Sequence, residues 1–262
     1  MKQKVYIAFL SWSICISVSV FAQDKTRATP GSSTNSVGGK IMLVPFEPKL
    51  YMSEIDKKVH DQTNWTFNQI RENFRHQLDI QLQQKFKPFS PVVSFYKDSA
   101  KMAKDLLYLY GSKHYSYEAI DKPTASATKT VASTGIKNGQ VEVEMNDDKK
   151  FFTVTIDNKE TLAYFNKKYG ADYFVFINQL DIKTDPNSYN ITTNTYQRKV
   201  DIHYTILDKN TNLITAGIAS SYFSSKENSP KKIVDLSFSP AARFIADKFI
   251  AAVKPVPVSK TK

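Results

Sequence analysis

The sequence predicts a mixed α/β (α+β) fold, in which helices pack on a mixed β-sheet and one main domain carries an inserted hairpin region. Three observations predict it. Two short runs, residues 40–44 and 173–177, are apolar at nearly every position, which is typical of strands buried on both faces. A long amphipathic helix follows the first run. Residues 199–218 alternate between apolar and polar, which indicates a hairpin covered on one face.

The first strand is predicted over residues 40–44, and we expect it in the middle of the sheet. After a proline-containing loop, Thr66 and Gln69 have the spacing of a capping box. Apolar residues then recur at every fourth position, which predicts a long helix that Pro88 ends. The apolar row consists of Ile70, Phe74, Leu78, Leu82 and Phe86.

The segment after this helix is less regular. A shorter helix is expected from Ser99 to Tyr110, and residues 111–150 are predicted to be an insertion. Within the insertion, Asn138-Gly139 between alternating residues predicts a tight hairpin. A further strand is expected over residues 152–156, where apolar side chains alternate with polar ones.

The second buried run is preceded by a helix that begins after Asn158 and ends at Gly170. Residues 173–177 should again lie in the middle of the sheet. In the continuation of this strand, Leu180 and Ile182 alternate with polar side chains, so we expect only one face to be covered there.

A polar loop is predicted over residues 183–195, followed by a hairpin with its turn at residues 208–212. By this alternation His203 points outward. The closing helix is predicted to begin at Ser239-Pro240, through capping and a proline at its first position. Its inward face is expected to hold Ala241, Phe244, Ile245, Phe249 and Val253, and residues 254–262 form a tail.

Residues 1–22 have the pattern of a secretory signal peptide, with lysines at positions 2 and 4, an apolar core and a small-residue cleavage site. We expect cleavage after Ala22 and a flexible tether over residues 23–39, with one domain over residues 40–253. The alternative is an uncleaved membrane anchor, for which the serine-rich run is slightly short. The bulky Ile14 before Cys15 argues against lipid attachment. The protein is therefore expected to be periplasmic or secreted, and not an integral membrane protein once processed.

Composition excludes several function classes. The net charge is +11, but acidic residues are interleaved with the basic ones, so we expect a solvated basic surface and no nucleic-acid partner. Attraction to anionic lipid headgroups or polysaccharide stays open. Processing removes Cys15, the only cysteine, and with it disulfides, thiol catalysis and cysteine-bound metals. We expect no cofactor.

The order of the elements resembles a group of bacterial envelope domains. The segments that carry the resemblance are GGKIMLVPFEP, KYGADYFVFINQLDI, YTILDKNTNLITAGIAS and AARFIADKFIAAV, within residues 40–86 and 158–253. The group comprises the curli secretion lipoprotein, the TolB amino-terminal domain and the lipoprotein activators of penicillin-binding proteins. The resemblance implies a protein that is not an enzyme and that docks other envelope proteins or assembles into rings. The leader ending FAQ also resembles those of exported Bacteroidetes-type proteins.

Few residues have the spacing of a catalytic or metal site. The histidines His60, His76, His114 and His203 form no convincing pair, and His76 is expected on a solvated helix face near Asp79. No metal ligands and no catalytic residues are therefore predicted. One alternative stays open: Glu47 and Asp181 follow the two buried strands and could form a carboxylate pair for general acid–base hydrolysis.

The candidate partner-binding residues are Tyr189, Tyr196, Arg198 and Lys199, which flank the polar loop. Exposed tyrosine and arginine are enriched where partners bind. We therefore expect a non-enzymatic protein-binding or assembly domain with an envelope protein as its partner, and an oligomer is possible. The alternative is a hydrolase or carbohydrate-binding protein that acts on cell-envelope polymers.

Overall fold

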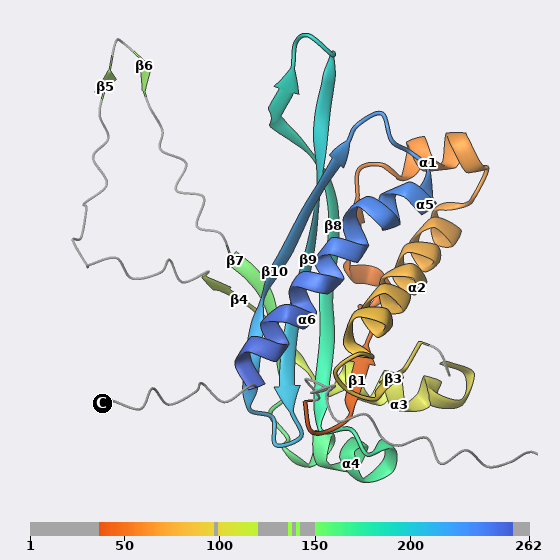
Figure 1. Ribbon diagram of the computed structural model, residues 1–262, viewed down its shortest axis with the longest axis vertical. Coiled ribbons are helices and arrows are strands. Elements are labelled where there is room, and N and C mark those ends of the chain that lie inside the picture. Colours follow the sequence, from red (N-terminus) through yellow and green to blue (C-terminus); the bar gives the residue numbers. More distant parts are fainter. Residues whose placement is uncertain (1–36, 97–98, 120–135, 138–139, 142–149, 254–262) are drawn as a thin grey trace, which may run out of the picture. The chain divides into compact units, whose positions relative to one another are not determined.

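The computed structural model describes residues 37–96, 99–119, 136–137, 140–141 and 150–253, which belong to one compact unit spanning residues 35–262. The predicted signal peptide, the tether up to residue 36 and the tail lie outside the described residues. The main sheet has the strand order β10-β9-β8-β1-β3, with β2 also paired to β8 (Figure 1). Its strands are β1 (Ile41–Val44), β2 (Tyr51–Ser53), β3 (Val92–Ser94), β8 (Tyr173–Asn190), β9 (Thr195–Asp208) and β10 (Leu213–Ser224).

The sheet is mixed, as predicted. β1 runs parallel to both β3 and β8, whereas β8, β9 and β10 are antiparallel to one another. All four residues of β1 are buried, and β8 is buried from Phe174 to Ile182. The two apolar runs are therefore central strands because helices or strands cover both of their faces.

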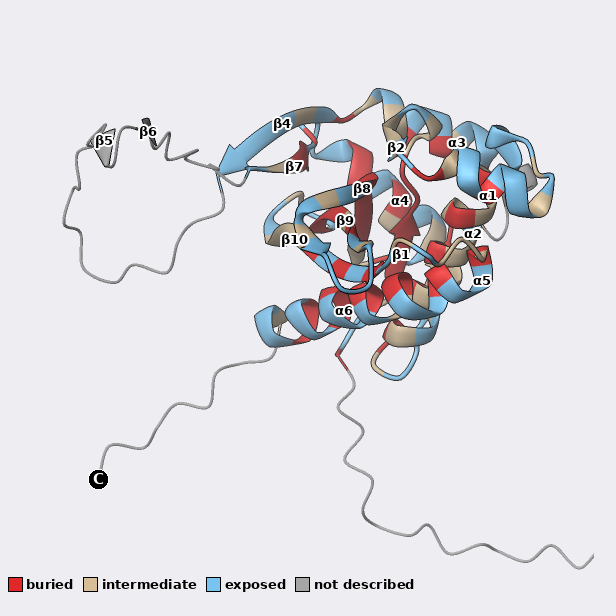
Figure 2. Cartoon of the chain, turned by 90° about the horizontal axis from the view of Figure 1, so that it is seen from above, coloured by how far each residue is buried: buried red, intermediate tan, exposed pale blue. Residues whose placement is uncertain are grey.

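One face of the sheet is covered by α2 and α6, whose inward faces are buried (Figure 2). The row predicted on α2 is buried throughout, and Phe74 and Phe86 meet Phe238 and Phe249 edge-to-face at 5.4 and 5.7 Å. Burying one such side chain contributes about 1.5–3 kcal/mol. The helices on this side are α1 (Asp56–Thr63), α2 (Phe67–Phe86), α5 (Pro230–Ile233), the π-helical η2 (Val234–Phe238) and α6 (Ser239–Val253); a short 3₁₀ turn, η1 (Pro48–Leu50), precedes β2.

The predicted capping box is present, because Thr66 Oγ1 accepts from the Gln69 amide at 3.2 Å and Gln69 Oε1 accepts from the Thr66 amide at 2.8 Å. On the opposite face of the sheet, α3 (Ser99–Gly111) and α4 (Glu160–Tyr169) cover β1 and β8. Gly170 ends α4 in the left-handed conformation, with φ of +71°, as its position after the helix predicted.

A small second sheet lies at the ends of the segment predicted as an insertion over residues 111–150. β4 (His114–Ala119) pairs antiparallel with β7 (Lys150–Thr155), so both ends of that segment belong to the packed unit. The predicted Asn-Gly hairpin is confirmed in its flanking residues, since β5 (Ile136–Lys137) pairs with β6 (Gln140–Val141). Sequence analysis did not predict β4, although Tyr115, Tyr117 and Ala119 alternate there with polar residues, and the strand is mostly exposed.

The second sheet also explains why His203 is not exposed. The backbone amide of Phe152 donates to His203 Nδ1, and that of Val154 donates to Thr205 Oγ1. β7 therefore covers the face of β9 that alternation alone assigned to solvent. The polar side chains of Gln179 and Asp181 were also predicted to face solvent, but they are only 6 and 4% exposed.

Three more details of the prediction are wrong. The polar loop over residues 183–195 is a ribbon, because β8 continues to Asn190 and β9 begins at Thr195. The closing helix α6 begins at Ser239, as predicted, but Ser239 is not its cap, because it is already helical and α5, η2 and α6 run on without a break. The π-helical η2 accommodates Pro240, which lacks the N–H that a regular helix needs there. Phe244, predicted to face inward, is 42% exposed.

Candidate functional site

The β8–β9 ribbon extends beyond the strands beside it. β2 pairs with β8 only as far as Ile182. From Lys183 to Asn190, the described strand pairing of β8 is with β9 alone. Figure 1 shows this ribbon continuing well past the ends of β1 and β3. We call residues 186–197, which comprise the end of β8, the turn and the start of β9, the ribbon tip. The ribbon tip projects beyond β1 and β3, and the loop after β10 reaches it, because the Tyr196 amide donates to Ser225 Oγ at 3.1 Å and Lys226 Nζ donates to the Thr193 carbonyl at 3.4 Å.

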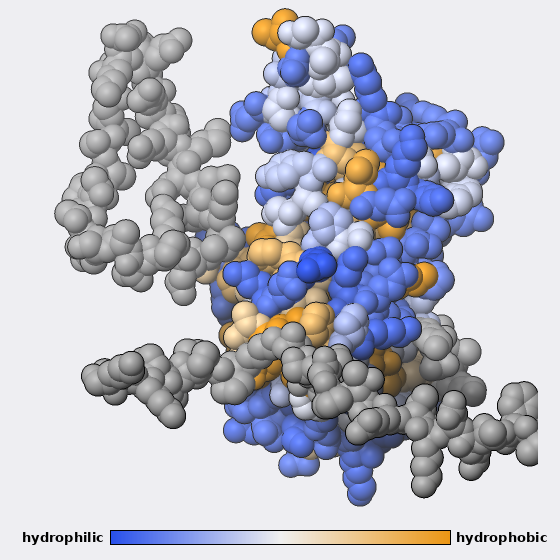
Figure 3. Space-filling model, in the orientation of Figure 1, coloured by the Kyte–Doolittle hydropathy of each residue, from blue (hydrophilic) through white to orange (hydrophobic). Residues whose placement is uncertain are grey.

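Tyr189 and Tyr196 lie together on the ribbon tip. Their ring centroids are 4.7 Å apart, and the side chains are 44 and 38% exposed. Tyr189 OH donates to Asn194 Oδ1 at 2.9 Å, and Asn194 adopts a positive φ of 50° that closes the turn. Ile191 is 83% exposed at this turn, and Figure 3 shows an apolar patch at the end of the ribbon.

The ribbon tip has an unusual composition. None of its residues is charged, and apart from Pro186 and Ile191 every one carries a hydroxyl or an amide. Tyrosine, serine and asparagine are the residues that dominate antibody contact loops, because tyrosine buries a large area at low entropic cost and the others adapt their hydrogen bonds. These residues are Asn187, Ser188, Tyr189, Asn190, Thr192, Thr193, Asn194, Thr195, Tyr196 and Gln197.

Arg198 and Lys199, which were predicted beside the tyrosines, are placed differently. Arg198 is only 1% exposed, and its Nη1 donates to Glu227 O at 2.7 Å and to Asn228 Oδ1 at 2.9 Å. Lys199 pairs with Asp201 at 2.8 Å. Arg198 is buried because the loop after β10 folds over it, which local sequence cannot reveal. It therefore anchors the base of the ribbon and does not face a partner.

A second polar cluster lies where β1 ends. Tyr115 OH donates to Glu47 Oε1 at 2.9 Å, and Lys49 and Lys113 approach the same carboxylate at 2.9 and 3.5 Å. Burial acts to raise the pKa of Glu47, but the hydrogen bonds from Lys49 and Tyr115 and the charge of Lys113 hold it below its ordinary value. Glu47 is thus an ionised, well-partnered carboxylate, whereas a general acid needs a raised pKa.

Lys113 is the most deeply buried amine of this cluster. Its side chain is 1% exposed, and its Nζ lies 4.3 and 4.8 Å from the ring centroids of Tyr110 and Tyr115. Burial lowers the pKa of Lys113 to about 8, although Glu47 opposes the shift. A lysine with a lowered pKa is a functional candidate, but its enclosure by two tyrosine rings favours a packing role.

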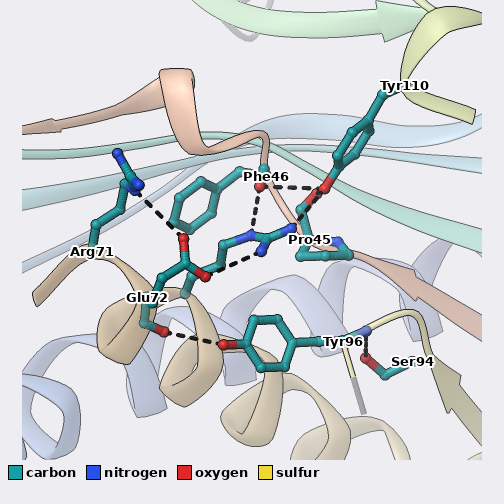
Figure 4. Close-up of polar contacts among 8 residues, drawn as sticks. Pro45, Phe46, Arg71, Glu72, Ser94, Tyr96 and Tyr110 are labelled. Carbon is teal, nitrogen blue, oxygen red and sulfur yellow. Dashed lines mark hydrogen bonds and ion pairs between the residues drawn. The ribbon is translucent and has the colours of Figure 1, made fainter. Parts of the chain in front are cut away.

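Arg75 joins this cluster to α2, as Figure 4 shows. Its Nε donates to Phe46 O at 2.8 Å and its Nη2 donates to Tyr110 OH at 2.9 Å, while Tyr110 OH donates to Pro45 O at 2.7 Å. Arg75 lies outside the apolar row of α2, so local periodicity alone places it on the solvated face of the helix. Its role depends on a loop 29 residues earlier in the chain, for which the sequence carries no local signal.

The other predicted site residues are dispersed. Among the described contacts, Asp181 is partnered by Gln179 at 2.6 Å and by Lys183 at 2.8 Å, not by Glu47. The histidines occupy four separate environments: His60 contacts the Trp65 carbonyl, His76 stacks on Tyr96, His114 pairs with Asp157, and His203 holds β7. Within the described ranges, no three histidine or acidic side chains gather closely enough to hold a metal.

The fold defines the class of protein as a mixed α/β domain. No protein-family model matches the chain, and no curated protein sequence does. Two solved structures are similar to this chain, each at 12% sequence identity. The first is the lipoprotein GNA1162 from Neisseria meningitidis; the match covers 80% of this chain and 99% of the lipoprotein, with a TM-score of 0.38. The second is the hypothetical protein CT253 from Chlamydia trachomatis; the match covers 82% of this chain and 95% of that protein, with a TM-score of 0.37.

Neither of these structures bears the name of the curli secretion, TolB or penicillin-binding-protein activator groups. The two matches therefore give no support to that particular resemblance. Among the helices that the structure describes, none has both the length and the apolar character needed to cross a bilayer.

Proposed function

We propose that this protein is exported to the bacterial envelope and acts there as a non-enzymatic binding domain, with the ribbon tip as its contact surface for a protein partner. The observation that carries the proposal is the pair Tyr189 and Tyr196, exposed side by side on an uncharged tip with Ile191 at its end. The leader over residues 1–22 supports export, and the resemblance to envelope docking domains points the same way.

The chemistry of the ribbon tip describes the partner. Since residues 186–197 carry no charge, the partner should present a polar, uncharged surface that matches the hydroxyls and amides of the tip. It should also offer a small apolar recess for Ile191, because a centrally placed, exposed aliphatic side chain gains most from a desolvated pocket.

Preorganisation also supports binding at the tip. Arg198 anchors the base of the ribbon, and Ser188 Oγ accepts from the Gln197 amide at 2.7 Å across it. The tip is therefore held before a partner arrives, so that less conformational entropy is lost on binding.

The test has two parts. A photo-crosslinking residue is placed at position 192, and the proteins crosslinked to it in cells are identified. The same capture is then repeated with the double variant Tyr189→Ala, Tyr196→Ala. We expect one discrete envelope protein to be crosslinked, and its capture to fall at least tenfold in the double variant. Tyr164→Ala is the matched control, because Tyr164 is 45% exposed on α4, and it should leave capture unchanged. Equal capture by the double variant would refute the site.

Salt dependence gives a second measurement. Residues 186–197 carry no charge, and the two charged side chains hydrogen-bonded to their backbone, Asp185 and Lys226, have opposite signs. Raising the ionic strength from about 0.05 to 0.5 M should therefore change the affinity for the captured protein less than threefold. A loss of affinity by orders of magnitude would instead show that the basic surface carries the interaction. Amino-terminal sequencing of the protein from cells tests export separately, and Gln23 is the expected first residue.

A further inference from the structure

A groove runs along the outer side of α2. Two hollows of about 340 and 460 Å³ lie there and share His76 and Tyr96 as lining residues. The first extends from His76 toward the start of the helix, and the second passes Asp79 toward its end. We call the two together the α2 groove. Because they share residues, the α2 groove is suited to a ligand longer than one small unit. The first hollow is lined by Trp65, Gln69, Glu72, Asn73, His76 and Tyr96.

The middle of the α2 groove is held rigidly. The rings of His76 and Tyr96 stack with centroids 4.8 Å apart, and the Arg75 guanidinium lies 5.3 Å from the Tyr96 ring centre. Figure 4 shows Tyr96 directed toward α2, where its OH donates to the Glu72 carbonyl at 3.4 Å. The Tyr96 amide also donates to Ser94 Oγ at 2.9 Å. The wall is therefore formed before any ligand binds.

The α2 groove carries little charge, although the chain as a whole is strongly basic. Glu72 pairs with Arg71 and Arg75 at 3.5 and 3.3 Å. Asp79 is buried, accepts from Ser94 and Gln83, and has a pKa raised by burial. Lys87 is the lysine in the lining, at the far end of the second hollow. Nucleic acid and other polyanions need a row of cations, so this groove is poorly matched to them.

Its polar groups instead match hydroxyls. Asn73, Gln83 and Gln84 have amide side chains, which both donate and accept hydrogen bonds. A sugar hydroxyl has the same dual character, so an amide can serve two neighbouring hydroxyls. Trp65 and the exposed His76 supply flat rings for the apolar face of a sugar unit.

The α2 groove lies where open α/β sheets commonly bind ligands. β1 and β3 are parallel, and Tyr96 lies two residues after the end of β3. Ligands of open α/β sheets bind beyond the carboxyl ends of parallel strands. From the shape, the near-neutral lining and the amide side chains, we propose that the α2 groove binds a neutral linear oligosaccharide. This site is separate from the ribbon tip and does not depend on the function proposed for it.

The test uses Trp65 as its probe. The chain has two tryptophans, Trp12 and Trp65, and Trp12 lies in the predicted leader. Trp12→Phe leaves Trp65 as the sole tryptophan whether or not the leader is removed. In this background the full protein is titrated with chitotetraose, a cell-wall type of glycan, and separately with maltotetraose, a storage type. We expect a saturable change in emission with at least one of them, confirmed by titration calorimetry.

Variants then locate the binding. Asn73→Ala and His76→Ala should each weaken the affinity at least tenfold, equivalent to about 1.4 kcal/mol. Gln77→Ala is the matched control, since Gln77 is a half-buried amide on the same helix as the half-buried Asn73 and is not part of the lining. All three variants should keep their melting temperature. Absence of saturable heat and emission change with both sugars, or unchanged affinity in the first two variants, would overturn the proposal.

Discussion

The backbone amide of Phe152 donates a 2.8 Å hydrogen bond to Nδ1 of His203, and so ties the second sheet to the main one through a side chain. Neighbouring contacts extend this seam, because Thr205 Oγ1 accepts from the Val154 amide and Asn178 Nδ2 donates to the Phe152 carbonyl. Thr153 Oγ1 and Thr205 Oγ1 also lie 2.9 Å apart across the seam, so side-chain hydrogen bonds join the two sheets in place of strand pairing.

This seam predicts a pH dependence of stability. Burial lowers the pKa of His203, although Asp181 and Asp201 act to raise it while Lys183 and Lys199 act with burial. The folded state therefore favours the neutral ring, in which Nδ1 can accept. The contribution is fully present above the ordinary histidine pKa of about 6.5, and it is lost as the pH falls through the lowered folded pKa.

His203→Asn removes the titration and keeps an acceptor in place of Nδ1. We expect the free energy of unfolding of the wild type to fall below pH 6.5, by at most about 1.4 kcal/mol per pH unit from this group. The variant should show a flatter profile over the same range. Urea unfolding between pH 5 and 7.5 makes the comparison, and parallel profiles would contradict the assignment.

Lys113 predicts a dependence at alkaline pH. Its pKa is about 8 in the folded state, below the ordinary value of 10.5, so the folded protein loses this proton earlier than the unfolded chain. Stability from Lys113 should therefore increase as the pH rises from 8 toward 10. Lys113→Met keeps the aliphatic packing and removes the effect. Unfolding measured at pH 8, 9 and 10 should show a less positive slope for the variant; equal slopes would contradict the lowered pKa.

Arg198 and Lys199 should differ sharply in their effect on stability. Arg198→Ala leaves the Glu227 carbonyl and Asn228 without their donor and empties a buried volume, which predicts a loss of about 2–4 kcal/mol. Lys199→Ala removes one partly exposed ion pair and should cost less than about 1 kcal/mol. Urea unfolding of both variants measures the difference. Similar costs would mean that Arg198 is not the anchor of the ribbon.

Strong periodicity made the central elements predictable. The α2 row from Ile70 to Phe86, its Thr66 cap, the buried β1 and the Gly170 helix end all follow from local patterns, and the structure has each of them. The ribbon end was missed because residues 183–195 bury neither face, so no apolar alternation marks them as strand. The sequence indicated Tyr189 and Tyr196 as contact residues, but not that their rings would meet.

The amino-acid sequence by itself determined which segments are central strands and helices, because burial on one or both faces leaves a periodic apolar pattern. Only the tertiary structure decided which polar residues are buried. Arg198, His203 and Arg75 look solvated by their local spacing, yet each is covered or engaged by a segment distant in the chain. The physical reason is that a buried polar group is stable only with a partner, and those partners come from contacts that local sequence does not encode.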